Sequence, residues 1–107
     1  MTPPLESKVQ ASLIEHLHQN NWFVTKVNLA SVAGFPDLIA IKDGRTVFIE
    51  VKRPGGSPRK LQEVCHRKLK EHGAEVIVYD GITPFEMILS QRVTSSKLRD
   101  DCDWSRL

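Results

Sequence analysis

The chain has 107 residues, of which 40% are hydrophobic and 26% are charged, and its formal net charge is +2. This length predicts one domain with a single core of one sheet and two or three helices, and excludes a second domain. No apolar run approaches the roughly 20 residues of a membrane span, no signal-peptide pattern opens the chain, and Cys65 and Cys102 match no metal-ligand spacing. These features predict a protein of a reducing cytoplasm, with free thiols and no membrane partner.

The first predicted helix runs from Leu5 to about Asn20, behind a capping Thr2 and two prolines that suit a first helical turn. Its apolar stripe has helical spacing and consists of Val9, Leu13 and Leu17. At about 100° per residue, Glu6 projects within about 20° of that stripe, so a carboxylate shares the buried face. Two explanations stay open: Glu6 complements the helix dipole, or it reaches a metal site directly or through water.

Residues 22–27 form a predicted first strand, and a β-hairpin follows after a loop of small residues. The two strands of the hairpin, residues 37–42 and 45–52, are alternating apolar runs separated by Asp43-Gly44. Asp-Gly between two such runs is typical of a two-residue hairpin loop, which fixes the register of both strands.

This register pairs Ile39 with Phe48 and brings polar side chains together at the open end of the hairpin. Asp37 is expected to face Glu50, with their Cβ atoms roughly 5 Å apart, and Lys52 projects from the same face. Two adjacent carboxylates repel, and a divalent cation between them removes that repulsion. The pattern therefore predicts a metal-dependent phosphodiesterase centre. The alternative is an ordinary pair of Glu50 with Lys52, beside a turn capped by Asp37.

A second helix is predicted after the loop at residues 54–56, from a capping Ser57 to His72, with Gly73 as its stop. Its expected core face consists of Leu61, Val64, Cys65 and Leu69. Gln62 lies on the line of that face near the helix start, so it could reach the carboxylates. A polar residue at the edge of the core is the alternative for Gln62.

A fourth strand is predicted at residues 75–79, which makes the strand–helix–strand unit a right-handed parallel crossover. A capping box at residues 83–86 opens a short helix through about Gln91. Apolar side chains of this helix, such as Phe85, Met87 and Leu89, could pack on the sheet or form a subunit interface. Residues 92–107 are a polar tail, which Trp104 could dock on the body or on a second subunit.

Basic side chains are concentrated in residues 52–70, which carry seven basic residues against one acid. The segment has a charge of +6, and the rest of the chain has −4. A polyanion such as nucleic acid would explain a basic stretch that begins at the predicted site, and a solvated helix face is the alternative. The candidate DNA-binding residues are Arg53, Arg59, Lys60, Arg67 and Lys68.

The order of elements, with Asp at the start of the second strand and Glu50-Val51-Lys52 at the end of the third, resembles the PD-(D/E)XK nuclease superfamily. Within it the chain looks most like a VRR-NUC domain, of the small stand-alone type found in phages and bacteria. The matching positions are Glu6, Gly34-Phe35-Pro36-Asp37, the Glu-X-Lys segment and Gln62, and the resemblance covers about residues 5–80.

The resemblance implies an α/β fold with a restriction-endonuclease-like αβββαβ core. In this core a central mixed four-stranded sheet is flanked by helices, and a short C-terminal helix is added. Residues 1–91 would form the nuclease domain and residues 92–107 the tail.

The catalytic residues that the resemblance implies are Asp37, Glu50, Lys52, Gln62 and Glu6. Asp37 and Glu50 would ligate Mg²⁺ or Mn²⁺ together with the Val51 backbone carbonyl, and Glu6 would do so directly or through water. Lys52 would orient or help to deprotonate a metal-bound water and offset charge on the phosphate. No Ser-His-Asp spacing or activated cysteine offers another nucleophile. Surface or helix-end roles are expected for the four histidines, which are His16, His18, His66 and His72.

Small VRR-NUC proteins resemble dimeric enzymes that cut branched DNA, including four-way (Holliday) junctions. The chain is therefore expected to act as a homodimer in the cytoplasm of a bacterium or a phage-infected cell, with no organic cofactor. Recognition would rest on backbone charge and DNA shape. The alternatives are a catalytically silent DNA-binding module of the same fold and a restriction-type duplex endonuclease, and RNA stays open as a substrate.

Overall fold

The computed structural model describes residues 6–90. In chain order the elements are α1 (Glu6–Gln19), β1 (Phe23–Lys26), β2 (Leu38–Lys42), β3 (Arg45–Val51), α2 (Lys60–Glu71), β4 (Glu75–Tyr79) and α3 (Phe85–Ser90). The predicted αβββαβ core with a short final helix is confirmed. The expectations for the Thr2 cap, the tail and its Trp104 lie outside the described residues. No helix among residues 6–90 is long and apolar enough to cross a bilayer.

The four strands form one mixed sheet in the order β1-β2-β3-β4. The first three are antiparallel neighbours, and β4 runs parallel to β3, as a crossover through α2 requires. Ile39 pairs with Phe48, so the register predicted from the Asp-Gly loop is confirmed. Asp43 and Gly44 have φ values of 51° and 79°, which is the conformation that a type I′ hairpin turn demands.

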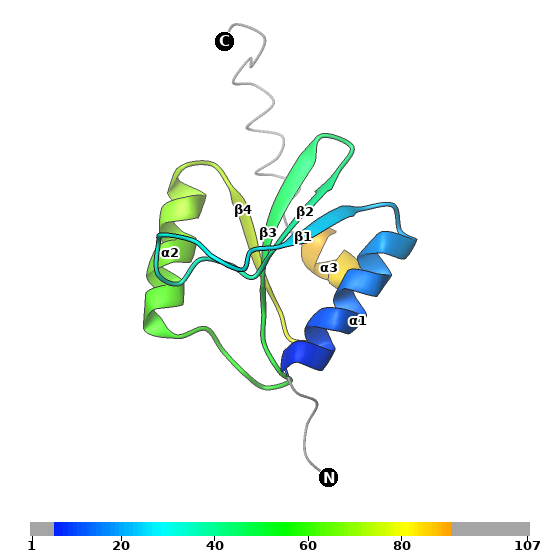
Figure 1. The fold of residues 1–107 in the computed structure, drawn as a ribbon, viewed down its shortest axis with the longest axis horizontal. Helices are drawn as coiled ribbons and strands as arrows, with labels where there is room; N and C mark the ends of the chain where they lie inside the picture. Colours follow the sequence, from blue (N-terminus) through cyan, green and yellow to red (C-terminus); the bar gives the residue numbers. More distant parts are fainter. Residues whose placement is uncertain (1–5, 91–107) are drawn as a thin grey trace, which may run out of the picture.

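The helices divide between the two faces of the sheet, with α2 on one face and α1 and α3 on the other (Figure 1). Alternate residues of β3 separate in the same way, because successive strand side chains point to opposite faces. Val47 and Ile49 join the core under α1 and α3, whereas Glu50 points to α2 and binds Gln62 there. The core consists of Val9, Leu13, Leu17, Trp22, Leu38, Ala40, Val47, Ile49, Val51, Ile77, Phe85 and Leu89.

Helix α2 begins later than predicted. Its N-cap is Arg59, not Ser57, and the helix starts at Lys60. The Arg59 backbone N–H donates to Oε1 of Gln62 at 2.8 Å, so the side chain of Gln62 satisfies one backbone donor at this helix start. Leu61 is 64% exposed, so its predicted place in the core is wrong.

Helix α3 packs into the core through Phe85 and Leu89, and the partly buried Ile88 packs against that core. Phe85 and Leu89 are buried, and Phe85 packs edge-to-face on Trp22 at 5.9 Å between ring centroids. The use of Phe85 and Leu89 as an exposed subunit interface is therefore excluded, although Met87 is exposed. Of the two predicted roles, packing on the sheet is the one observed for these side chains, because a helix this short is stable only when its apolar face is buried.

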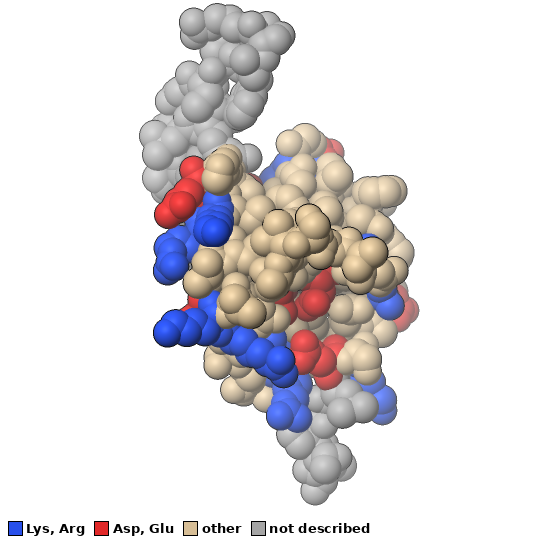
Figure 2. All heavy atoms as spheres, turned by 60° about the vertical axis from the view of Figure 1, so that its left-hand side comes forward, with Lys and Arg blue, Asp and Glu red and all other residues tan. Residues whose placement is uncertain are grey.

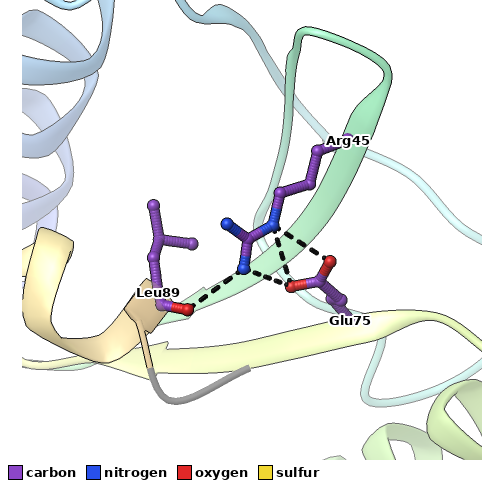
Figure 3. Close-up of polar contacts among 3 residues, drawn as sticks. All are labelled: Arg45, Glu75 and Leu89. Atoms are coloured by element: carbon purple, nitrogen blue, oxygen red, sulfur yellow. Dashed lines mark hydrogen bonds and ion pairs between the residues drawn. The ribbon is translucent and has the colours of Figure 1, made fainter. Parts of the chain in front are cut away.

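An ion pair fixes the far end of α3 (Figure 3). The guanidinium of Arg45, at the start of β3, donates to both carboxylate oxygens of Glu75 at 2.8–3.2 Å. The same guanidinium donates to the backbone carbonyl of Leu89 at 3.1 Å. Arg45 thus links the starts of two parallel strands with the last turn of α3, while the Glu75 side chain is almost fully buried.

Candidate metal centre and active site

Three carboxylates from three separate elements meet at one end of the sheet. Glu6 lies in the first turn of α1, Asp37 directly precedes β2, and Glu50 is close to the end of β3. One oxygen from each lies within 4.8 Å of the other two. Glu6 is exposed, Asp37 is half-buried and Glu50 is 1% exposed, so the cluster opens to solvent on the side of α1.

Asp37 is held by the backbone of the neighbouring strand. The Val51 N–H donates to Oδ2 of Asp37 at 2.9 Å. The carbonyl of Asp37 accepts from the N–H of Val27 at 2.8 Å, which extends the pairing beyond β1. These bonds set the Asp37 carboxylate beside Glu50, as the hairpin register requires.

Glu50 is a buried carboxylate in a crowded polar environment. Its Oε2 accepts from the Gln62 amide at 2.9 Å and lies 3.5 Å from Nζ of Lys52. Burial and, after it, the charge of Asp37 raise the pKa of Glu50 from 4.5 to about 7, while Lys52 acts in the opposite direction. Near neutral pH the buried Glu50 carboxyl is therefore only partly ionised, and an additional positive charge beside it would favour the ionised form.

Lys52 places an ammonium group between the carboxylates and an open pocket. The residue is 7% exposed, which is unusual for lysine unless the charge is paired. A pocket of about 460 Å³ begins beside it and is lined by Glu6, Lys52, Arg53, Gly56, Ser57 and Arg59. Most of these lining groups are cationic or offer polar hydrogens, so the pocket suits an anionic group close to the carboxylates.

The side-chain amide of Gln62 connects the start of α2 to the carboxylate cluster through both its oxygen and its nitrogen. The oxygen accepts from the Arg59 backbone, and the nitrogen donates to Glu50. The loop before β2 presses against the same helical turn at Gly34, where an added Cβ would lie 2.5 Å from the Leu61 carbonyl oxygen. Gly34 also has a φ of +81°, so both its small size and its backbone conformation are required there.

His66 is the site residue that sequence reasoning missed. It was expected on the surface or at a helix end, but it is 6% exposed, and its Nε2 lies 3.5 Å from Oε1 of Glu50. The available signal was its spacing from Gln62, because residues four apart on a helix share a face. The role expected for His72 at a helix end is confirmed, since its ring contacts the Lys68 carbonyl. His16, also outside the site, pairs with Glu86.

The candidate DNA-binding residues lie on the surface around α2. All five are exposed, and they are Arg53, Arg59, Lys60, Arg67 and Lys68. In Figure 2, which brings the α2 side of the molecule forward, Lys and Arg atoms form a band next to a group of acidic atoms. A cationic band beside a carboxylate cluster can hold a polyanion backbone near that cluster.

The donor set of the cluster fits a hard divalent cation. Glu6, Asp37 and Glu50 supply only carboxylate oxygens, which are the ligands that Mg²⁺ and Mn²⁺ prefer. Burial and, after it, the charge of Asp37 raise the pKa of Glu50 more than Lys52 lowers it, so the ionised Glu50 lacks compensating positive charge. A cation among the three oxygens would supply that charge and stabilise the ionised carboxylate.

Comparison with known proteins agrees with this geometry. No family model matches the sequence. Over 77 residues the chain is 30% identical to "Putative nuclease p44" of Acyrthosiphon pisum secondary endosymbiont phage 1, with 71% of this chain and 83% of that protein covered. A solved structure of a "VRR_NUC domain" superposes with a TM-score of 0.65 at 25% identity, covering 83% of this chain and 94% of the other. From its fold, its carboxylate cluster and these relatives, the chain belongs to the VRR-NUC family of nucleases.

Proposed function

We propose that the protein is a metal-dependent endonuclease that hydrolyses phosphodiester bonds in branched DNA, such as four-way junctions. The observation that carries this proposal is the convergence of Glu6, Asp37 and Glu50 beside a buried lysine. The relatedness to phage and VRR-NUC proteins supports a nuclease. Beyond nuclease activity, we propose the metal, the branched substrate and the roles of the individual residues.

Asp37 and Glu50 would hold Mg²⁺ or Mn²⁺ together with the Val51 backbone carbonyl, and Glu6 would bind the ion directly or through water. When bound, the ion supplies Lewis-acid polarisation of the phosphate and a water of lowered pKa. The Val51 N–H supports this assignment, because it leaves Asp37 in a fixed orientation at the cluster.

Lys52 and Gln62 would act on the groups around the ion. The Lys52 ammonium lies at the junction of the carboxylates and the open pocket, where it can orient the attacking water and offset charge that grows on the phosphate. Gln62 would keep the Glu50 carboxylate in place through its amide hydrogen bond. Hydrolysis by an activated water needs no covalent intermediate on the protein.

The exposed basic residues around α2 would bind the DNA backbone without contacts that distinguish one base from another. Arg53 and Arg59 line the pocket next to the carboxylates, while Arg67 lies further along α2. Binding through phosphates releases counterions, so affinity should fall steeply with salt. Selection among DNA structures would then depend on the shape of the branch rather than on base contacts.

A homodimer would present two such sites with two-fold symmetry, which matches paired cuts across a junction. Exposed apolar side chains on β1 and the following loop offer surface for subunit contact, and they are Phe23, Leu29 and Val32. Sedimentation at micromolar concentration measures the oligomeric state. A monomer would exclude paired cutting by a preformed dimer but not the nuclease activity.

The function is tested by incubating a labelled four-way junction, a flap and a linear duplex with Mg²⁺, Mn²⁺ or EDTA. We expect metal-dependent cutting of the branched substrates by the wild type and none by Glu50→Gln. Glu15→Gln, an exposed acid on α1, is the matched control and should cut normally. Equal cutting of linear duplex at discrete positions would instead indicate a restriction-type enzyme. Binding without cutting, unchanged in Glu50→Gln, would indicate a silent DNA-binding module.

A further inference from the structure

Two buried polar atoms face each other behind the carboxylate cluster. Within the described part of the chain, Oε1 of Glu50 and Nε2 of His66 are buried side-chain atoms that have no hydrogen-bond partner. The two atoms lie 3.5 Å apart, just beyond the usual length of an N–H···O bond. A buried donor or acceptor left unsatisfied costs on the order of 1–3 kcal/mol, so this arrangement calls for an explanation.

Helix α2 approaches the Glu50 carboxylate at both oxygens. Gln62 and His66 are four residues apart, so their side chains lie on one face of the helix, one turn from each other. The amide of Gln62 binds Oε2, and the imidazole of His66 faces Oε1. One rigid element therefore contacts each end of a single carboxylate.

The contact between His66 and Glu50 requires a proton on one ring nitrogen of His66. An ionised carboxylate only accepts hydrogen bonds, so His66 can bind Oε1 only if its Nε2 carries a proton. A neutral imidazole with the proton on Nε2 provides that donor without adding a buried charge.

We propose that His66 is a positioning residue, which donates from Nε2 to Oε1 of Glu50 and, with Gln62, holds that carboxylate ready to ligate a divalent cation. This inference rests on the proposed function, because it concerns the same metal site. Groups that orient metal ligands in this way raise metal affinity without touching the ion, and losing one typically weakens binding 10- to 100-fold. A residue with only a packing role would be replaced by leucine without loss of metal affinity.

The test is Mn²⁺ binding by titration calorimetry, with the apo stability of each variant measured alongside. We expect His66→Leu to raise the Kd for Mn²⁺ roughly 10-fold. His66→Gln retains an N–H donor at a similar reach and should keep most of the wild-type affinity. His18→Leu removes an exposed histidine of α1 and should change nothing. Equal affinity in His66→Leu and the wild type would overturn the proposal.

Failure of the inference can be separated from failure of the metal site itself. Glu50→Gln should abolish specific Mn²⁺ binding. If both Glu50→Gln and Asp37→Asn still bind Mn²⁺ as the wild type does, the metal site and this inference are overturned together. If His66→Leu does not fold, ¹⁵N NMR of the wild-type histidines at about pH 8, where Glu50 is ionised, gives the answer. A ring protonated at Nε2, with that proton shifted on adding Mg²⁺, supports the role. A ring protonated only at Nδ1 contradicts it.

Discussion

The Val51 backbone N–H binds Oδ2 of Asp37 at 2.9 Å, so the last residue of β3 holds a carboxylate that precedes β2. Asp37 therefore has two functions in this account. Its charge belongs to the cluster with Glu6 and Glu50, and its hydrogen bond closes the open end of the hairpin. The two functions can be separated by substitution.

Asp37→Asn should lose cleavage and keep the fold, because an asparagine oxygen still accepts from Val51 while the negative charge is gone. Asp37→Ala should lose cleavage and also about 1–2 kcal/mol of unfolding free energy, since the Val51 N–H is left unsatisfied. Cleavage assays and urea unfolding of both variants check this. Normal stability in Asp37→Ala would show that the Val51 hydrogen bond contributes nothing.

The pH dependence of stability should report the buried Glu50. Its pKa is about 7 in the folded state against 4.5 for an ordinary glutamate, so the folded state holds this proton more tightly. The Glu50 contribution is therefore present at low pH and is lost as pH rises from about 4.5 to about 7, by on the order of 3 kcal/mol. In EDTA, the wild type should lose stability relative to Glu50→Gln over that range.

The comparison with Glu50→Gln is essential to that experiment. Burial lowers the pKa of His66, and this effect makes stability rise with pH in the neighbouring range, opposite in sign to the effect of Glu50. The difference between the two proteins isolates Glu50. Mn²⁺ should restore the wild type most strongly near pH 8, because the ion binds the ionised carboxylate. A difference that does not change with pH would contradict the assignment.

Two glycines with similar backbone conformations should respond differently to alanine. Gly34 and Gly44 have φ values of +81° and +79°, but only at Gly34 would a Cβ strike backbone, at Leu61 and Gln62. Gly44→Ala should cost about 1 kcal/mol of stability and leave cleavage intact. Gly34→Ala should cost about 2–4 kcal/mol and reduce cleavage, because the first turn of α2 must shift away from Glu50. Thermal unfolding and cleavage assays check both variants.

Arg45→Met should destabilise the protein without a direct effect on the site. The guanidinium pairs with the buried Glu75 and binds the Leu89 carbonyl, and removing it should cost about 2 kcal/mol, reduced from a fully buried pair because Arg45 is partly exposed. Lys26→Met is the exposed control on β1 and should be neutral. At temperatures well below the unfolding midpoint, the metal affinity of Arg45→Met should match that of the wild type. An undiminished unfolding temperature would exclude a structural role for Arg45.

The sheet could be predicted from the sequence because its signals are local. Asp43-Gly44 permits the positive φ values of a two-residue turn, and that turn fixed the pairing of Ile39 with Phe48. The parallel strand at residues 75–79 follows from the stop at Gly73 and an apolar run. Each of these features depends on the backbone preferences of one or two residues.

The start of α2 and the place of His66 could not be predicted in the same way, because both depend on tertiary contacts. The Gln62 side chain that accepts from the Arg59 backbone is held by Glu50, a distant partner, and the helix begins at Lys60. His66 looks like a polar surface residue until the carboxylate beside it is known. These positions depend on contacts with residues far away in the chain, and a single sequence does not show which residues make such contacts.

We propose that Asp37 and Glu50, with Glu6 beside them, hold the divalent cation that activates hydrolysis. Anomalous diffraction from crystals grown with Mn²⁺ tests it most directly. We expect an anomalous peak in contact with carboxylate oxygens of Asp37 and Glu50, and no such peak in Glu50→Gln crystals. Mn²⁺ bound elsewhere, with these carboxylates free of metal in a protein that cuts DNA, would contradict it.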